Sequence, residues 1–183
     1  MTGAALPVAA WRPRIVGNLS RWRRMPAPAD PGAVGLRHAA VSVCLVDRGR
    51  EAHVVVIKRV ARGRHPGQWA LPGGRLEPSE TAARAAAREL AEEVAIAAEP
   101  AGVVGALDDF VSAAGFVITP FVVLAGAGAV PRRNPDEVHS VHLIPVRRLL
   151  DPALPRWRPV PGGGRLLQMP LRRGMVVHAP TGA

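Results

Sequence analysis

The stretch GRLEPSETAARAAARELAEEVAI, residues 74–96, contains the features that decide the fold of this chain. Residues 79–94 have the periodicity of an amphipathic helix, and Ser79 is the predicted N-cap because a serine hydroxyl readily accepts a free backbone N–H. Apolar residues recur four, three and four positions apart in this helix. They predict one buried stripe formed by Ala83, Ala87, Leu90 and Val94.

Three carboxylates crowd the second half of the predicted helix. Glu89, Glu92 and Glu93 fall within five positions, and side chains three or four residues apart on a helix are neighbours. Like charges at that spacing cost only about 0.2–0.5 kcal/mol per pair on an exposed helix, so a solvated acidic face is one interpretation. A cation site is the other interpretation, because hard divalent ions such as Mg²⁺ prefer carboxylate oxygens.

The spacing of the charged residues resembles the Nudix box. That motif has Gly, five residues, Glu, seven residues, and then Arg-Glu-aliphatic-x-Glu-Glu-x-Gly-aliphatic. The matching positions are Gly74, Glu80, Arg88, Glu89, Leu90, Glu92, Glu93 and Ile96. The one departure is Ala95, which stands where the family has a glycine that tolerates a left-handed backbone after the helix. We expect Ala95 to alter the exit from the helix without removing a ligand.

The resemblance implies a metal-dependent enzyme. In Nudix hydrolases the glutamates coordinate Mg²⁺ or Mn²⁺, and these ions bind the pyrophosphate of a nucleoside diphosphate derivative. The predicted metal ligands are Glu89, Glu92, Glu93 and the carbonyl of Gly74. Glu80 is expected to pair with Arg88 and support the site rather than take part in the chemistry.

The general base does not transfer cleanly from the family, because its position varies. The predicted catalytic residues are Glu89, Glu93 and Glu137. Glu89 is the first choice for the base, while Glu137 precedes a predicted strand and is a candidate for a further ligand or the base. Asp108, Asp109 and Asp136 are expected to be solvated loop carboxylates.

The segment before the box, VVIKRVARGRHPGQWALPGG (residues 55–74), resembles the motif of the coenzyme A pyrophosphatase branch. The corresponding positions are Arg59, Arg64, Gly67, Gln68, Pro72, Gly73 and Gly74. The departures are Ile57-Lys58, Val60, Leu71 and one residue fewer between Arg64 and Gly67. Arginines bind phosphates through two donors at once, so the predicted substrate-binding residues are Arg59, Arg62 and Arg64. Surface arginines with no ligand are the alternative.

The implied reaction is hydrolysis of coenzyme A or an acyl-CoA to 3′,5′-ADP and a phosphopantetheine. One alternative keeps the chemistry and changes the substrate to ADP-ribose, a dinucleotide or a damaged nucleoside triphosphate. A second alternative is a non-catalytic Nudix-like sensor whose Arg-rich ends bind nucleic acid. All the carboxylates of the box are present and no nucleic-acid-binding motif is visible, so we expect a small nucleotide substrate rather than nucleic acid.

Strand-like and helix-like segments alternate along the chain, which predicts a mixed α/β fold, and the resemblance implies the Nudix α/β/α sandwich with a mixed sheet. The predicted strands are 39–46, 53–58, 101–107, 115–124 and 138–144, with two further short strands near the end of the chain. Pro120 is expected to make its strand an edge strand or to introduce a bulge. A short helix is predicted over 146–150.

The predicted domain covers residues 36–183, behind a basic element and linker over 1–35; similar sequences imply that a terminal helix is missing. The formal charge of +10 is carried mostly by the two ends, and only one of the 24 basic residues is a lysine. One cysteine, Cys44, excludes an internal disulfide and suits a reducing compartment. We expect a cytoplasmic protein with no membrane partner, while the Arg-rich, acid-free residues 11–24 are also typical of a mitochondrial transit peptide. A homodimer is left open.

Overall fold

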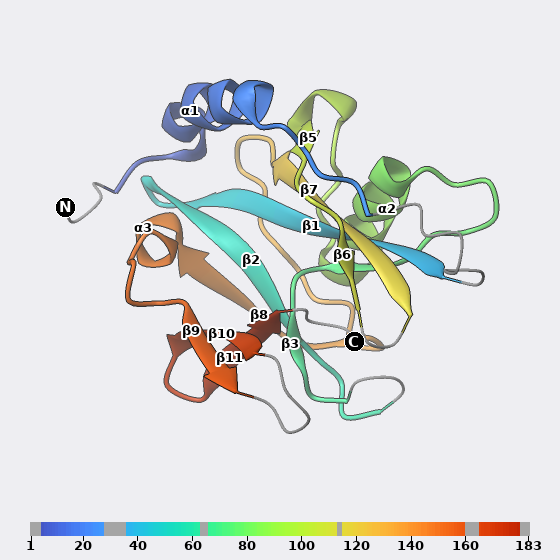
Figure 1. Cartoon of the computed structure of the whole chain (residues 1–183). Helices are drawn as coiled ribbons and strands as arrows, with labels where there is room; N and C mark the ends of the chain where they lie inside the picture. Colours follow the sequence, from blue (N-terminus) through green and yellow to red (C-terminus); the bar gives the residue numbers. More distant parts are fainter. Residues whose placement is uncertain (1–4, 28–35, 63–65, 113–114, 160–164, 180–183) are drawn as a thin grey trace.

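A computed structural model describes residues 5–27, 36–62, 66–112, 115–159 and 165–179. One large mixed sheet forms the centre of the molecule (Figure 1). Its long strands are β1 (Arg37–Arg48), β2 (Glu51–Arg59), β7 (Phe116–Leu124) and β8 (Val138–Pro145). Its short strands are β3 (Trp69–Ala70), β4 (Gly73–Arg75), β5 (Val103–Ala106) and β6 (Phe110–Val111). The predicted mixed α/β sandwich is confirmed.

β1 and β2 pair with each other only near the turn that joins them, and they separate where β3 and β4 lie. β1 runs antiparallel to β2 over residues 45–48 and parallel to β7 over residues 37–45. The other half of β1 pairs with β4, the far end of β2 pairs with β3, and β8 pairs with β2 from His53 to Arg59. The loop between β3 and β4 therefore lies between the diverging ends of β1 and β2, next to helix α2 (Ala82–Val94).

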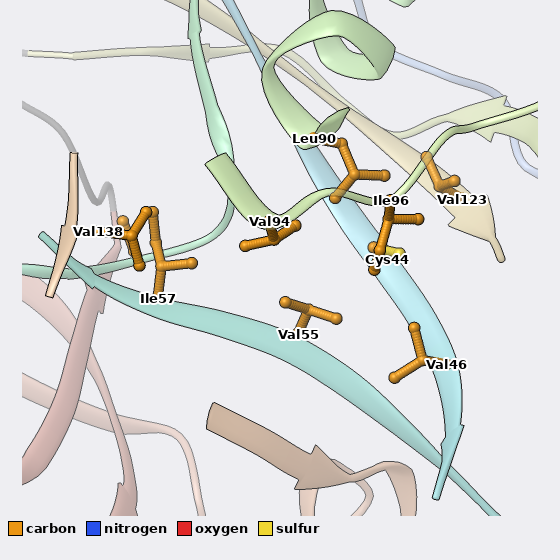
Figure 2. Packing of buried hydrophobic residues seen from close by; sticks show 10 residues of the cluster. Cys44, Val46, Val55, Ile57, Leu90, Val94, Ile96, Val123 and Val138 are labelled. Atoms are coloured by element: carbon orange, nitrogen blue, oxygen red, sulfur yellow. The ribbon is translucent and has the colours of Figure 1, made fainter. Parts of the chain in front are cut away.

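Helix α2 covers one face of the sheet. Side chains alternate between the two faces along a strand, and those that point toward α2 form one apolar cluster (Figure 2). Its labelled members are Cys44, Val46, Val55, Ile57, Leu90, Val94, Ile96, Val123 and Val138. Full burial stabilises each such aliphatic side chain by roughly 1.5–3 kcal/mol, so this cluster fixes α2 on the sheet.

The opposite face is covered by the two ends of the chain. Helix α1 (Val8–Arg21) packs there, against Leu45 and Val54, and the second sheet packs against Val56. That sheet consists of β9 (Arg156–Pro159), β10 (Arg165–Arg172) and β11 (Met175–Ala179). The short helix α3 (Val146–Leu149) and the 3-10 turn η1 (Pro100–Gly102) complete the structure. No helix in the described ranges is long and apolar enough to cross a membrane.

Helix α2 begins later than predicted, and of the predicted stripe Leu90 and Val94 are fully buried. Its N-cap is Thr81, whose hydroxyl accepts the N–H of Arg84, whereas Ser79 lies in the preceding turn with a φ of 65°. The buried residues are Ala85, Ala86, Leu90, Glu93 and Val94. The prediction placed the first half of the stripe over Ala83 and Ala87, which are only half-buried, and it missed the buried carboxylate because it counted apolar residues alone.

Pro120 does not lie in an edge strand, contrary to the prediction. β7 pairs with β1 on one side and with β5 and β6 on the other. The carbonyl of Pro120 accepts the N–H of Leu107, which follows the last residue of β5. The nitrogen of Pro120, which has no hydrogen to donate, thus faces the break between β5 and β6. No ladder hydrogen bond is lost there. The alternative prediction, a bulge at Pro120, is wrong too: the register irregularity lies in β5, between Val103 and Gly105, opposite Val122 and Val123.

Candidate active site

Four segments meet at one end of α2. The helix supplies Glu89 and Glu93, one turn apart, and β4 passes beside them. The backbone N–H of Gly73 donates to Oε2 of Glu93 at 2.9 Å. Arg59, the last residue of β2, donates from Nη1 to Oε1 of Glu93 at 3.2 Å. The fourth segment is the loop before β8, which carries Glu137.

The loop before β8 is anchored to the last turn of α2. The N–H groups of Arg132 and Asn134 donate to the carbonyls of Val94 and Glu93 at 2.8 and 2.9 Å. These carbonyls belong to the helix end, where no intrahelical donor remains. The side chain of Asn134 accepts the N–H of Asp136 at 3.1 Å, which shapes the turn that leads to Glu137. Sequence reasoning missed this anchor, although Asn134-Pro135 is a turn signal.

Glu89, Glu93 and Glu137 form one carboxylate cluster. Each offers an oxygen that lies within 4.8 Å of the other two. Glu93 is fully buried, Glu89 is half-buried and Glu137 is exposed, so the cluster extends from the protein interior to solvent. Glu92, also predicted as a ligand, is not among the grouped side chains and lies largely in solvent.

Burial perturbs the acids of this cluster. It raises the pKa of Glu93 to about 8, against the hydrogen bond from Gly73 and the charge of Arg59, which lower it. Burial also raises the pKa of Glu89, and the hydrogen bond from Arg88 opposes that shift. Repulsion from Glu137 raises both values further. Neighbouring carboxylates therefore make Glu89 and Glu93 harder to ionise until positive charge is supplied.

Arg88 connects the acids of the box. Its Nε and Nη2 donate to the two oxygens of Glu80, each at 3.0 Å, which is the pairing expected from the resemblance. Its Nη1 reaches Glu89 at 3.0 Å and Glu92 at 2.9 Å, and Nη2 also donates to the carbonyl of Arg75. These hydrogen bonds lower the pKa of Glu80 and raise that of Arg88.

Gly74 lies directly against Glu89. A β-carbon at Gly74 would come within 2.2 Å of Oε1 of Glu89 and within 2.4 Å of its carboxyl carbon. A β-carbon at Gly73 would come within 2.3 Å of the carbonyl oxygen of Ala40. The Gly73-Gly74 pair is therefore required by close approach, of the backbone to β1 in one case and of the catalytic helix to β4 in the other.

The predicted substrate arginines have different environments. Arg59 pairs with Glu93, and Arg62 pairs with Asp136 at 3.3 Å on the surface. Arg64 lies outside the described residues. The two described arginines thus have carboxylate partners, rather than being unpaired surface donors.

Two of the acids expected to be solvated hold the N-terminal segment instead. Asp109 accepts the N–H of Ala27 and the hydroxyl of Thr119, and it pairs with Arg24. Asp108 accepts the indole N–H of Trp22. Elsewhere, Cys44 is fully buried and burial raises its pKa to about 12, which makes it an inert core residue.

The charge balance of the site fits a divalent cation. Two guanidinium groups, those of Arg59 and Arg88, serve the four carboxylates of Glu80, Glu89, Glu92 and Glu93, and Glu137 adds a fifth. Oxygen ligands with an excess of negative charge and an open, solvent-facing side are the ligand set that Mg²⁺ and Mn²⁺ prefer.

Comparison with known proteins gives the family. The sequence model of the NUDIX domain matches residues 36–162. The chain belongs to the Nudix family. A relative, the uncharacterized Nudix hydrolase NudL of Citrobacter koseri, is 34% identical over 143 residues, which cover 78% of this chain and 73% of NudL. This Nudix protein is therefore a hydrolase of pyrophosphate bonds.

Solved structures share the Nudix fold. A MutT/nudix family protein of Enterococcus faecalis superposes with a TM-score of 0.52 at 18% identity, covering 86% of this chain and 54% of that one. The NUDIX domain of Shewanella oneidensis NrtR, crystallised with ADP-ribose, gives a TM-score of 0.50 at 21% identity and covers 68% of this chain and 82% of that domain. At these identities the likeness extends to the fold.

Proposed function

We propose that this Nudix hydrolase cleaves the pyrophosphate bond of coenzyme A or an acyl-CoA, giving 3′,5′-ADP and a phosphopantetheine. The observation that carries the substrate assignment is the contact of Arg59 with Glu93. Arg59 is the first arginine of the segment that resembles the coenzyme A pyrophosphatase motif. Its position beside the carboxylate cluster supports a role for that segment at the site of the diphosphate.

Glu89, Glu93 and Glu137 would hold a divalent cation, and the carbonyl of Gly74 and the carboxylate of Glu92 remain predicted further ligands. The bound ion supplies positive charge for the diphosphate and acidifies water. Glu93 is the rigid member of the set, because it is buried and held by Gly73 and Arg59. Glu137 is the exposed member of the set. An exposed carboxylate suits a ligand or base whose side chain changes position when the substrate binds.

We assign the role of general base to Glu89. Burial raises its pKa toward neutrality, where a carboxylate accepts a proton from water more readily. Arg88 holds Oε1 of Glu89 at 3.0 Å, and Gly74 lies directly against the same carboxylate. Arg88 and Glu80 act as positioning residues, because their bidentate pair fixes the guanidinium that orients Glu89.

ADP-ribose is the second candidate substrate, since the same fold in NrtR was crystallised with that ligand. Product analysis separates the candidates. The enzyme is incubated with Mg²⁺ or Mn²⁺ and equal concentrations of coenzyme A, ADP-ribose, a dinucleotide and a nucleoside triphosphate. Release of 3′,5′-ADP from coenzyme A at a kcat/KM at least about tenfold above the others supports the proposal. Turnover of ADP-ribose with no hydrolysis of coenzyme A contradicts it.

A further inference from the structure

The end of β2 presents cations on both faces of the sheet. Arg59 points toward α2 and Glu93, and Lys58, one residue earlier, belongs to the opposite face. Lys58 is the only lysine of the chain. Among the described residues, no carboxylate forms an ion pair with Lys58, whereas Arg59 and Arg62 each have one.

Aromatic and polar side chains surround Lys58. It pairs in register with Trp69 of β3 on one side and with Ser140 of β8 on the other. Its ammonium lies 5.5 Å from the centre of the Trp69 ring. The ring of His142 meets Trp69 edge to face, with ring centres 4.7 Å apart and an interplanar angle of 76°. The group is thus held together by direct contacts.

Further cations converge on His142. Its Nε2 lies 2.9 Å from the hydroxyl of Ser140, which is also 3.2 Å from Nδ1 of His139. Arg172, from β10, donates through Nη2 to the carbonyl of Leu143 at 2.7 Å, next to His142 in the chain. The pKa of His142 is lowered by burial first, and then by the charges of Arg172, Lys58 and His139. Arg172 and Lys58 are the two permanently charged groups among these causes, and both are cations.

We propose that Lys58, His142 and Arg172 form a binding site for a phosphate monoester on the face of the sheet opposite the carboxylate cluster. Like charges gathered on a half-buried surface repel one another unless an anion lies among them. Lysine binds phosphate as a compact point charge and arginine through its planar fork. The ring of Trp69, 5.5 Å from the ammonium, adds a cation–π contact that positions Lys58. A dianion also favours the protonated form of His142.

Two ligands share this chemistry: a free phosphate anion and a remote phosphate group of the substrate. The second of these rests on the proposed function. The site itself is tested without turnover, by titrating inorganic phosphate into the metal-free protein. Lys58 offers the only lysine amine, so reductive ¹³C-methylation, which keeps its charge, gives it a resonance that NMR can follow separately from the N-terminus. The ring signals of His142 provide a second readout.

We expect saturable shifts of the Lys58 and His142 signals, with a rise in the pKa of His142. Lys58→Met, followed through His142, is expected to weaken phosphate binding by at least about tenfold, and Arg172→Met likewise. Arg48→Met is the matched control, because Arg48 is an exposed arginine at the turn between β1 and β2. Absence of saturable shifts up to roughly 50 mM phosphate, or equal weakening by Arg48→Met, overturns the site.

The source of the phosphate is assigned by comparing coenzyme A with dephospho-coenzyme A. If the substrate supplies it, the ratio of the two KM values approaches one in Lys58→Met while kcat changes little. If a free anion supplies it, the ratio is the same in the variant and the parent, although phosphate still shifts the His142 signals of the parent. If the enzyme cleaves neither compound, the proposed function is wrong, and the phosphate titration still tests the site by itself.

Discussion

The guanidinium of Arg59 lies 3.2 Å from the buried carboxylate of Glu93 and joins the end of β2 to the last turn of α2. The carboxylate cluster therefore contains its own counter-ion when no divalent cation is bound. Arg59 stabilises the charged form of Glu93, and it also repels any cation that approaches the same oxygens. Removing Arg59 should have opposite effects on the metal-free and the metal-bound protein.

At pH 9, above the raised pKa of Glu93, Arg59→Met is expected to lower the free energy of unfolding of the metal-free protein by about 3 kcal/mol, because a buried carboxylate loses its partner. Added Mn²⁺ at pH 9, where proton competition at Glu93 is small, should raise Tm more in this variant than in the parent. Thermal melts with chelator or Mn²⁺ measure both effects. Arg62→Met is the control, because Arg62 pairs only with Asp136 on the surface. Equal Tm gains in all three proteins would show that Arg59 has no electrostatic coupling to the cation site.

The raised pKa of Glu93 predicts how stability depends on pH. The folded protein holds this proton up to about pH 8, whereas an unfolded glutamate releases it near 4.5. Between these values the unfolded chain binds fewer protons, so the free energy of unfolding of the metal-free protein falls as pH rises. Glu93→Gln removes this dependence. Its Tm should exceed that of the parent by at least about 3 °C at pH 8.5 and match it near pH 4.

The same variant tests the role of Glu93 in catalysis. Turnover is expected to fall by at least about a thousandfold, since an amide cannot supply the charge of a ligand carboxylate. Calorimetric titration with Mn²⁺ should show a parallel loss of affinity. Near-normal turnover in a folded Glu93→Gln protein contradicts the assignment of Glu93 as a metal ligand.

Gly74→Ala tests the close approach between β4 and α2. The new methyl group would meet the carboxylate of Glu89, so the side chain must move away from the cluster. We expect activity to fall by about a hundredfold, with a smaller loss of stability than Gly73→Ala, whose methyl group would meet backbone atoms. Gly126→Ala is the matched control, because a β-carbon there meets nothing within 4 Å. Unchanged activity in Gly74→Ala would mean that the position of Glu89 is not critical.

The sequence predicted the central strands and α2 because each has a strong local pattern, with β-branched runs in the strands and a capped apolar repeat in the helix. It missed α1, where Pro13 interrupts a helix that its own sequence does not favour. Tertiary packing of Val8, Trp11, Ile15 and Leu19 compensates, and their spacing was the signal that could have revealed the helix. β9 carries no such signal, because all four of its residues are exposed.

The candidate site was predictable only where one segment contains it. Glu89 and Glu93 are one helical turn apart, so their proximity follows from local geometry. Glu137 was a candidate from its place before a strand, but its proximity to them depends on the hydrogen bonds that Arg132 and Asn134 donate to the end of α2. The pairing of Arg59 with Glu93 depends on the register of β2 against the rest of the sheet, which short-range patterns do not encode.

Ala95 is the one departure from the family motif, and its backbone conformation leads to a prediction about stability. It is exposed and ends α2 in the left-handed conformation, with φ 55° and ψ 32°, and its N–H closes the helix by donating to the carbonyl of Ala91. The chain therefore keeps the backbone turn for which the family uses glycine, at a cost of roughly 1–2 kcal/mol for a residue with a β-carbon. Ala95→Gly should raise the free energy of unfolding by about 1 kcal/mol after the entropy of the unfolded chain is included, with activity unchanged. Ala91→Gly, at an exposed position inside the same helix, should lower it by about 1 kcal/mol. Urea denaturation measures both variants, and a loss of stability in both would show that the left-handed turn after α2 is not strained by alanine.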